Sequence, residues 1–145
     1  MRLRANNGIE MLLRNSEGDI ICARCSIASR PLRRMRGLLG RRELPAGEGV
    51  LLSPGSSVHT FFMRFPIDVV FLNDELAVVG VAPKVSPWRT RSRRGARHVL
   101  ELAAGEAERT GLAVGTRLSL DAKTSHALEV SPVGPPRFER GTDGL

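Results

Sequence analysis

Residues 58–72, VHTFFMRFPIDVVFL, form the most apolar stretch of the chain, and this stretch also carries His59, Arg64 and Asp68. A carboxylate inside the run IDVVFL is costly to bury unless it is paired or hydrogen-bonded. We therefore expect the stretch to supply both the middle of the hydrophobic core and its main polar feature. Because Pro66 cannot donate to a β-ladder, it should divide the stretch into two strands, residues 58–63 and 67–72.

Short apolar segments separated by turn residues predict a β-rich fold for the rest of the chain. The predicted strands are residues 9–13, 20–28, 50–52, 58–63, 67–72, 76–81, 96–103 and 116–120. A helix is expected after the second strand, where Ser29 can cap it and Gly40 can end it, and residues 105–111 should make a short helical turn. Residues 83–95 are predicted to be a loop. Since strands do not alternate with long helices, the pattern favours a distorted β-barrel or jelly-roll-like sandwich over a doubly wound sheet.

The length of 145 residues fits one domain. We place this domain at residues 1–122 and interpret residues 123–145 as a mostly mobile tail. No apolar run is long enough to cross a bilayer, and the N-terminus lacks the apolar core of a signal peptide. We therefore expect a cytoplasmic protein. We also expect it to be a monomer.

The net charge is +7, and Lys84 and Lys123 are the only lysines, so arginine carries nearly all the positive charge. One interpretation is a surface that binds nucleic acid or another acidic partner by releasing counterions. The other is a base-composition effect, because Arg, Gly, Ala, Pro and Val all rise together in GC-rich genomes. The chain has no Tyr and a single Trp, which argues against an aromatic platform for stacking nucleic-acid bases.

The two cysteines, Cys22 and Cys25, lie inside a predicted strand. Zinc needs roughly four ligands, and the chain has no second Cys pair. Residues three apart on a regular strand point to opposite faces, so we expect these thiols to be reduced, structural and separated by the sheet.

Six blocks of residues resemble the domain-of-unknown-function 192 family, from about Ala23 to Leu120. The blocks are RGLLGR at 36–41, GVLL at 49–52, HTFFMRFPIDVVFL at 59–72, PWR at 87–89, VLELAAG at 99–105 and GLAVG at 111–115. The resemblance implies a compact, mostly β fold of distorted barrel or jelly-roll type. It implies no established activity, because the family lacks one.

Asp68, His59 and Glu101 are the ionisable residues embedded in apolar segments, and each has two interpretations. Asp68 is either a carboxylate held in a cleft, as a base or ligand anchor, or a buried acceptor that fixes loop amides or Arg64 in place. His59 is either a general base beside Asp68 or a core or rim histidine. Glu101 could pair with an arginine. The spacing of these groups gives no recognised metal motif, and we expect neither a metal nor a cofactor.

Arg64, Trp88 and Arg89 make a better argument for binding. A Trp with adjacent Arg offers a stacking face and a fork for carboxylate or phosphate. If the loop at 87–89 folds over the strands that carry His59 and Asp68, a small pocket forms there. The alternative is a Trp that plugs one end of the barrel.

The preferred hypothesis is a non-catalytic module that binds a small ligand or a peptide. Its site residues would be His59, Arg64, Asp68, Trp88, Arg89 and Glu101. A second hypothesis is an enzyme that uses Asp68 and His59 as acid and base. A third is an accessory protein that acts through its arginine surface. The chain has no nucleophile elbow and no phosphate-cradling glycine loop, so no known hydrolase, kinase or dehydrogenase motif decides among them.

Overall fold

The computed structural model describes residues 10–28 and 42–122 as a mainly β single domain. In chain order the elements are β1 (Glu10–Asn15), β2 (Ile20–Ala28), β3 (Glu48–Leu52), β4 (Ser57–His59), β5 (Ile67–Leu72), β6 (Val78–Val85), β7 (Thr90–Ser92), β8 (His98–Ala103), α3 (Glu106–Arg109) and β9 (Leu118–Ala122). Within these residues, no helix has the length and apolar character to span a membrane. The predicted helix between Ser29 and Gly40 and the predicted tail at 123–145 lie outside the described residues.

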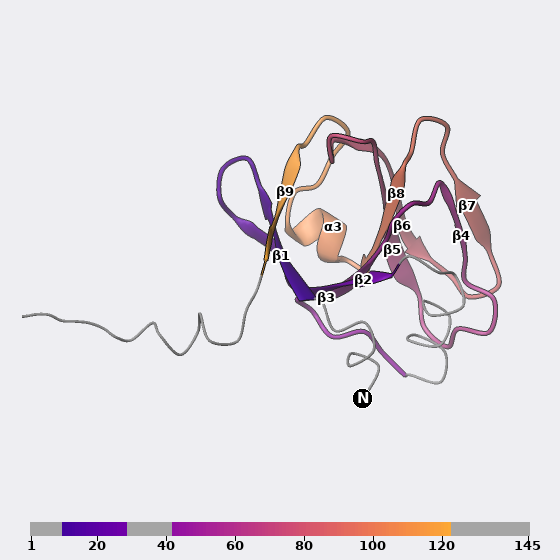
Figure 1. Ribbon diagram of the computed structural model, residues 1–145. Helices are drawn as coiled ribbons and strands as arrows, with labels where there is room; N and C mark the ends of the chain where they lie inside the picture. The colour runs from indigo at the N-terminus through magenta and orange to yellow at the C-terminus, as the bar shows by residue number, and fades with distance from the viewer. Residues whose placement is uncertain (1–9, 29–41, 123–145) are drawn as a thin grey trace, which may run out of the picture.

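Seven strands form one mixed sheet in the order β6-β5-β8-β3-β2-β1-β9, and β4 and β7 form a separate two-stranded ribbon. The β2–β3 pair is parallel, and the other neighbours are antiparallel. The large sheet curls around α3, as Figure 1 shows. Its edge strands meet at their first residues, through the bridge between Ala77 and Arg117 and three backbone hydrogen bonds around it: from Val78 to the Thr116 carbonyl, from Gly115 to the Val78 carbonyl and from Leu118 to the Leu76 carbonyl. These contacts do not continue as a ladder along β6 and β9, so the sheet is open, and no closed barrel is found in the described part of the chain.

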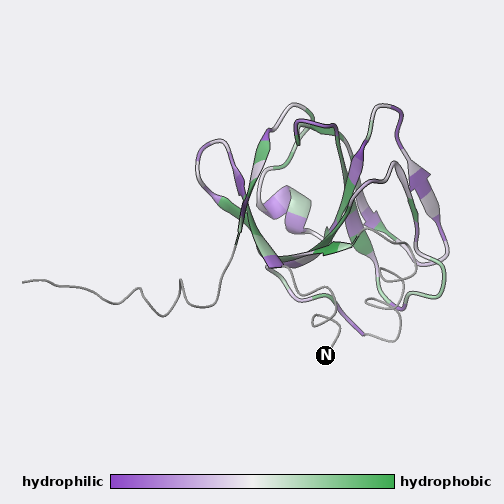
Figure 2. Cartoon of the chain, in the orientation of Figure 1, coloured by the Kyte–Doolittle hydropathy of each residue, from purple (hydrophilic) through white to green (hydrophobic). Residues whose placement is uncertain are grey.

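β5 lies inside the sheet and is buried along its whole length. Its side chains alternate between two hydrophobic clusters, as the two-residue period of a strand requires. Val70 and Leu72 belong to the inner cluster, which also holds Ala107 of α3. Ile67, Val69 and Phe71 belong to the outer cluster, which also holds Val58 of β4. The ribbon thus covers one face of the sheet and α3 the other. Figure 2 shows apolar residues along the curled sheet and polar residues on β7.

Three predicted segments differ from the structure in more than a shift of about two residues at a strand end. The strand predicted at 58–63 ends at His59, because Thr60 begins a turn. The strand predicted at 76–81 begins at Val78 and continues to Val85, and the loop predicted at 83–95 contains β7. The helical turn predicted at 105–111 is confirmed as α3, which Gly105 precedes in a left-handed conformation with φ of 94°.

Candidate functional site

Asp68 is completely buried at the second position of β5. Its hydrogen-bond partners are three backbone N–H groups. Lys84 donates to Oδ1 at 2.8 Å, and Gly105 and Ala107 donate to Oδ2 at 3.0 and 2.8 Å. Both carboxylate oxygens are thus occupied by main-chain donors, and His59 and Arg64 are not among the partners. This is the arrangement of a buried acceptor that fixes loop amides.

These bonds join three parts of the fold. Gly105 and Ala107 lie at the N-terminal end of α3, where the helix has no capping side chain of its own. Lys84 lies at an irregularity of β6, where the pairing shifts between Ile67 and Val69, and it has a positive φ of 49°. A carboxylate at a helix N-terminus satisfies orphan N–H groups and complements the helix dipole. Asp68, on β5, therefore caps the N-terminal end of α3 and also fixes the position of β6.

Glu101 is also completely buried, but it lies on the opposite face of the sheet from Asp68. In the β5–β8 register Asp68 faces Leu102, and Val69 faces Glu101. Residues directly opposite each other in an antiparallel pair share a face. The two carboxylates are therefore separated by the sheet, and the hypothesis that the embedded ionisable groups gather at one spot is wrong for this pair.

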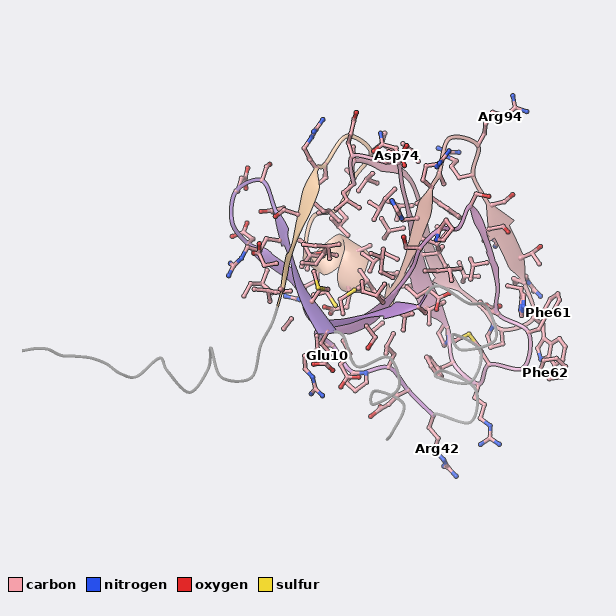
Figure 3. The ribbon with its side chains drawn as sticks, in the orientation of Figure 1. Glu10, Arg42, Phe61, Phe62, Asp74 and Arg94 are labelled. Carbon is pink, nitrogen blue, oxygen red and sulfur yellow. The ribbon has the colours of Figure 1, made fainter. Side chains whose placement is uncertain are left out.

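Four ring side chains form the part of the surface that we call the aromatic tip: His59, Phe61, Phe62 and Trp88. Phe61 stacks on His59 with ring centroids 4.7 Å apart and on Trp88 at 5.7 Å. Phe62 meets Trp88 at 4.6 Å in a tilted arrangement. Phe61, Phe62 and Trp88 are 36%, 60% and 55% exposed. Figure 3 shows Phe61 and Phe62 together at the outer edge of the molecule, projecting from the loop after β4.

Thr60 is a buried residue whose hydrogen bonds connect the two loops of the aromatic tip. It is 1% exposed, and its hydroxyl donates to the Ser86 carbonyl at 2.7 Å and accepts the Arg89 N–H at 2.9 Å. Its backbone N–H donates to the Arg89 carbonyl at 2.8 Å, and its carbonyl accepts the Trp88 N–H at 2.9 Å. The loops that carry Phe61 and Trp88 are thus fixed to each other. Sequence reasoning missed Thr60, and a threonine within an apolar run gives no signal for such a role.

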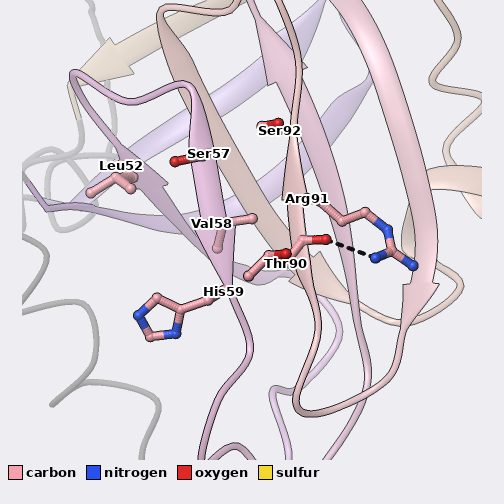
Figure 4. Close-up of a pocket in the computed structure, with 7 residues that line it drawn as sticks. All are labelled: Leu52, Ser57, Val58, His59, Thr90, Arg91 and Ser92. Carbon is pink, nitrogen blue, oxygen red and sulfur yellow. Dashed lines mark hydrogen bonds between the residues drawn. The ribbon is translucent and has the colours of Figure 1, made fainter.

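His59 also lines a cavity on the β4–β7 ribbon. The cavity has a volume of about 370 Å³, and its lining residues are Leu52, Ser57, Val58, His59, Thr90, Arg91 and Ser92. Figure 4 shows the His59 imidazole on one side of the ribbon and the Arg91 guanidinium on the other, bonded to the Thr90 carbonyl at 2.7 Å. Because Ser57 pairs with Ser92 and His59 with Thr90, their polar side chains share a face of the ribbon.

The remaining predicted site residues, Arg64 and Arg89, are both exposed. Arg89 follows Trp88 directly, and its Nη1 donates to the Trp88 carbonyl at 3.3 Å. Arg64 lies on the loop that carries Phe61 and Phe62. Of the predicted site residues, His59, Trp88 and Arg89 thus lie along the aromatic tip, whereas Asp68 is sealed inside. In the described part of the chain, no group of three or more His, Cys, Asp and Glu residues could hold a metal ion.

Cys22 and Cys25 lie on the same side of β2, so the prediction of opposite faces is wrong. A register shift in the β1–β2 pairing, where Met11 faces Cys25 and Leu13 faces Cys22, inserts one extra residue into β2. Both thiols join the inner cluster. The hydrogen bond with Cys25 lowers the pKa of the Cys22 thiol, and the same bond, with burial, raises the pKa of the Cys25 thiol well above its usual value. Both cysteines are free.

The fold and the site define a small mainly β protein with a structural carboxylate inside and an aromatic surface on its loops. The chain belongs to the DUF192 family, "Uncharacterized ACR, COG1430", whose model matches residues 13–120. The protein is similar to a UPF0127 protein of Pyrococcus furiosus, at 32% identity over 74% of this chain and 95% of the relative. It is also similar to a UPF0127 protein of Thermococcus sibiricus, at 27% identity over 85% of this chain and 82% of the relative.

Two crystal structures share the fold. One is a putative transcription regulator from Sinorhizobium meliloti, with a TM-score of 0.67, 24% identity, and coverage of 77% of this chain and 92% of that one. The other is a protein of unknown function from Novosphingobium aromaticivorans, with a TM-score of 0.65, 22% identity, and coverage of 77% and 84%. At these identities the similarity concerns the fold alone. The cytoplasmic location and the monomeric state stay predictions.

Proposed function

We propose that this protein is a binding module that takes a small polar molecule, or a polar peptide side chain, in the cavity on the β4–β7 ribbon. The observation that carries the proposal is the cavity itself, whose volume of about 370 Å³ falls within the size range of small-molecule sites. Leu52 and Val58 are the two apolar residues of its lining.

The polar part of the lining fits a ligand rich in hydrogen-bonding groups. Ser57, Thr90 and Ser92 bring hydroxyl groups that both donate and accept, and His59 adds a ring nitrogen. These four residues come from two paired strands, so their spacing is set by the ribbon rather than by a loose loop. A site on paired strands is positioned more accurately than a site on loops.

An acid–base enzyme built on Asp68 and His59 is not supported by this arrangement. The Asp68 carboxylate is fully buried and bonded to three backbone amides, whereas a general base must reach the proton of a bound substrate. The proposal therefore keeps His59 as a binding residue and assigns Asp68 to the fold.

Thermal-shift screening against saccharides, nucleosides, amino acids and small carboxylates tests the proposal, with Ser57→Phe to fill the cavity. Ser119→Phe on β9, also an exposed strand serine, is the matched control. We expect compounds that raise the melting temperature of the wild type and of Ser119→Phe but not of Ser57→Phe. Compounds that stabilise all three proteins equally would place the binding site elsewhere and contradict the proposal.

A further inference from the structure

The aromatic tip collects most of the large apolar side chains that the described part of the chain exposes. These exposed side chains are Ile20, Phe61, Phe62, Trp88 and Val114. Three of the five are in the tip, where Trp88 contacts both phenylalanines. Single exposed apolar residues are common on soluble proteins, whereas a contiguous exposed patch marks an interaction surface.

The backbone under the tip is held in an unfavourable conformation. Phe62 and Trp88 have φ values of 69° and 67°, in the left-handed region that bulky residues rarely adopt. Such conformations persist only where the surroundings fix them, and here Thr60 bonds both loops. The rings of Phe62 and Trp88 are therefore held on a fixed backbone, and its left-handed conformation lowers the stability of the fold.

The segments that build the tip and the ribbon carry charge of one sign. Residues 53–66 and 82–98 contain no Asp or Glu. Their basic residues, all exposed, are Arg64, Lys84, Arg89, Arg91, Arg93, Arg94 and Arg97. Arg64 and Arg89 lie next to the aromatic residues in the chain, whereas Figure 3 shows Arg94 far from Phe61 and Phe62. The tip thus combines exposed rings with the arginines Arg64 and Arg89. The two segments that form it, residues 53–66 and 82–98, contain no acidic residue.

We propose that the aromatic tip docks this protein onto an anionic lipid bilayer. Trp and Phe rings partition into the boundary between headgroups and acyl chains. Arginines beside them extend to lipid phosphates, and each cation near an anionic surface adds to the attraction. A protein partner usually presents both signs of charge, whereas a bilayer of anionic lipid presents one. This proposal concerns the exposed rings of Phe61, Phe62 and Trp88, which adjoin the ribbon cavity through His59, and it does not rest on the small-ligand proposal.

The contacts within the tip argue against nucleic acid as the occupant. Stacking of a base requires an open ring face. Trp88 already meets Phe61 and Phe62, and Phe61 also stacks on His59. Insertion of the ring edges into a lipid interface needs no such free face.

Trp88 is the only tryptophan, so its fluorescence reports on the tip directly. The full chain is titrated with phosphatidylcholine vesicles with and without phosphatidylglycerol. We expect a blue shift and protection from acrylamide quenching with the anionic vesicles alone, and loss of both as sodium chloride is raised. Phe62→Asn should weaken the partition at least about tenfold. Val114→Asn, which changes a residue that is 66% exposed on another loop, should leave it unchanged.

Other outcomes overturn the proposal. No Trp88 response to anionic vesicles at low salt, or an equal response to neutral vesicles, removes the anionic bilayer as the occupant. An equal partition of Phe62→Asn and wild type removes the tip as the docking surface. A response to a single-stranded oligonucleotide or an acidic peptide without a response to vesicles assigns the surface to that partner instead. Ser57→Phe should keep the vesicle response in every case that supports the proposal, because Ser57 is not among the rings that insert, although the cavity adjoins the tip through His59.

Discussion

Asp68 and the aromatic tip both place a side chain in an unfavourable environment, but in opposite ways: one buries a carboxylate, and the other exposes apolar rings. Asp68 places a carboxylate in the interior, and three backbone N–H groups hydrogen-bond its two oxygens. The tip places Phe62 and Trp88 in solvent on a left-handed backbone, and no contact within the described residues buries them. A buried carboxylate whose oxygens are hydrogen-bonded stabilises the fold. Apolar rings that are exposed on a rigid backbone instead point to an external partner.

Thr60 shares one property with each of these two regions. It is as buried as a core residue, yet its hydrogen bonds act on the loops that present Phe61 and Trp88. The polar interior therefore supports recognition only indirectly, by fixing loops. This division separates substitutions that reduce stability from those that reduce binding, and three predictions test it.

The largest effect on stability is expected from Asp68→Asn. The amide keeps a single oxygen acceptor, so its NH2 group opposes either the Lys84 N–H or the N–H groups of Gly105 and Ala107, and the charge at the start of α3 is lost. We expect a loss of about 3 kcal/mol in the free energy of unfolding, measured by urea denaturation. Amide hydrogen exchange should accelerate at Lys84, Gly105 and Ala107 first. Asp74→Asn, at an exposed carboxylate, is the control, and a similar loss in both variants would contradict the assigned role.

Thr60→Val should have an intermediate effect. The change removes the hydroxyl and leaves the Ser86 carbonyl and the Arg89 N–H without that partner. We expect a loss of about 1–3 kcal/mol in unfolding free energy and a broader, more easily quenched Trp88 emission. Thr90→Val, at an exposed position of β7, is the matched control. An unchanged Trp88 environment in Thr60→Val would show that the tip keeps its form without this residue.

Phe62→Asn should have the smallest effect on stability. Whether the free energy of unfolding rises or falls shows whether the Phe62 ring packs as part of the fold. Asn adopts the left-handed conformation more readily than Phe, and a side chain that is 60% exposed loses little packing. We expect the unfolding free energy to stay the same or to rise by up to about 1 kcal/mol. A thermal melt beside Val114→Asn checks the expectation. A clear loss would mean that the Phe62 ring packs as part of the fold.

Much of the fold could be predicted because local patterns decide it. The apolar run at β5 and the turn residues around α3 give the right elements, and Asp68 in that run predicts a buried acceptor as one of two interpretations. The bulge in β2 could not be predicted, because one extra residue in a strand leaves no mark in the sequence. That extra residue turns Cys25 to the side of Cys22.

The candidate site was predicted less completely, because exposure is a property of the tertiary structure. Phe61 and Phe62 lie in the most apolar stretch of the chain, so their pattern predicts burial rather than the outer edge of the molecule. Trp88 and Arg89 were predicted to bind, and they lie at the surface beside these rings. The opposite faces of Asp68 and Glu101 follow from the register of β5 and β8, which the sequence does not reveal.

Urea unfolding of Asp68→Asn and Phe62→Asn, side by side with the wild type, tests the division between fold and recognition most directly. The account predicts a loss of about 3 kcal/mol for Asp68→Asn and no loss for Phe62→Asn. Equal losses in the two variants, or a larger loss for Phe62→Asn, would contradict it.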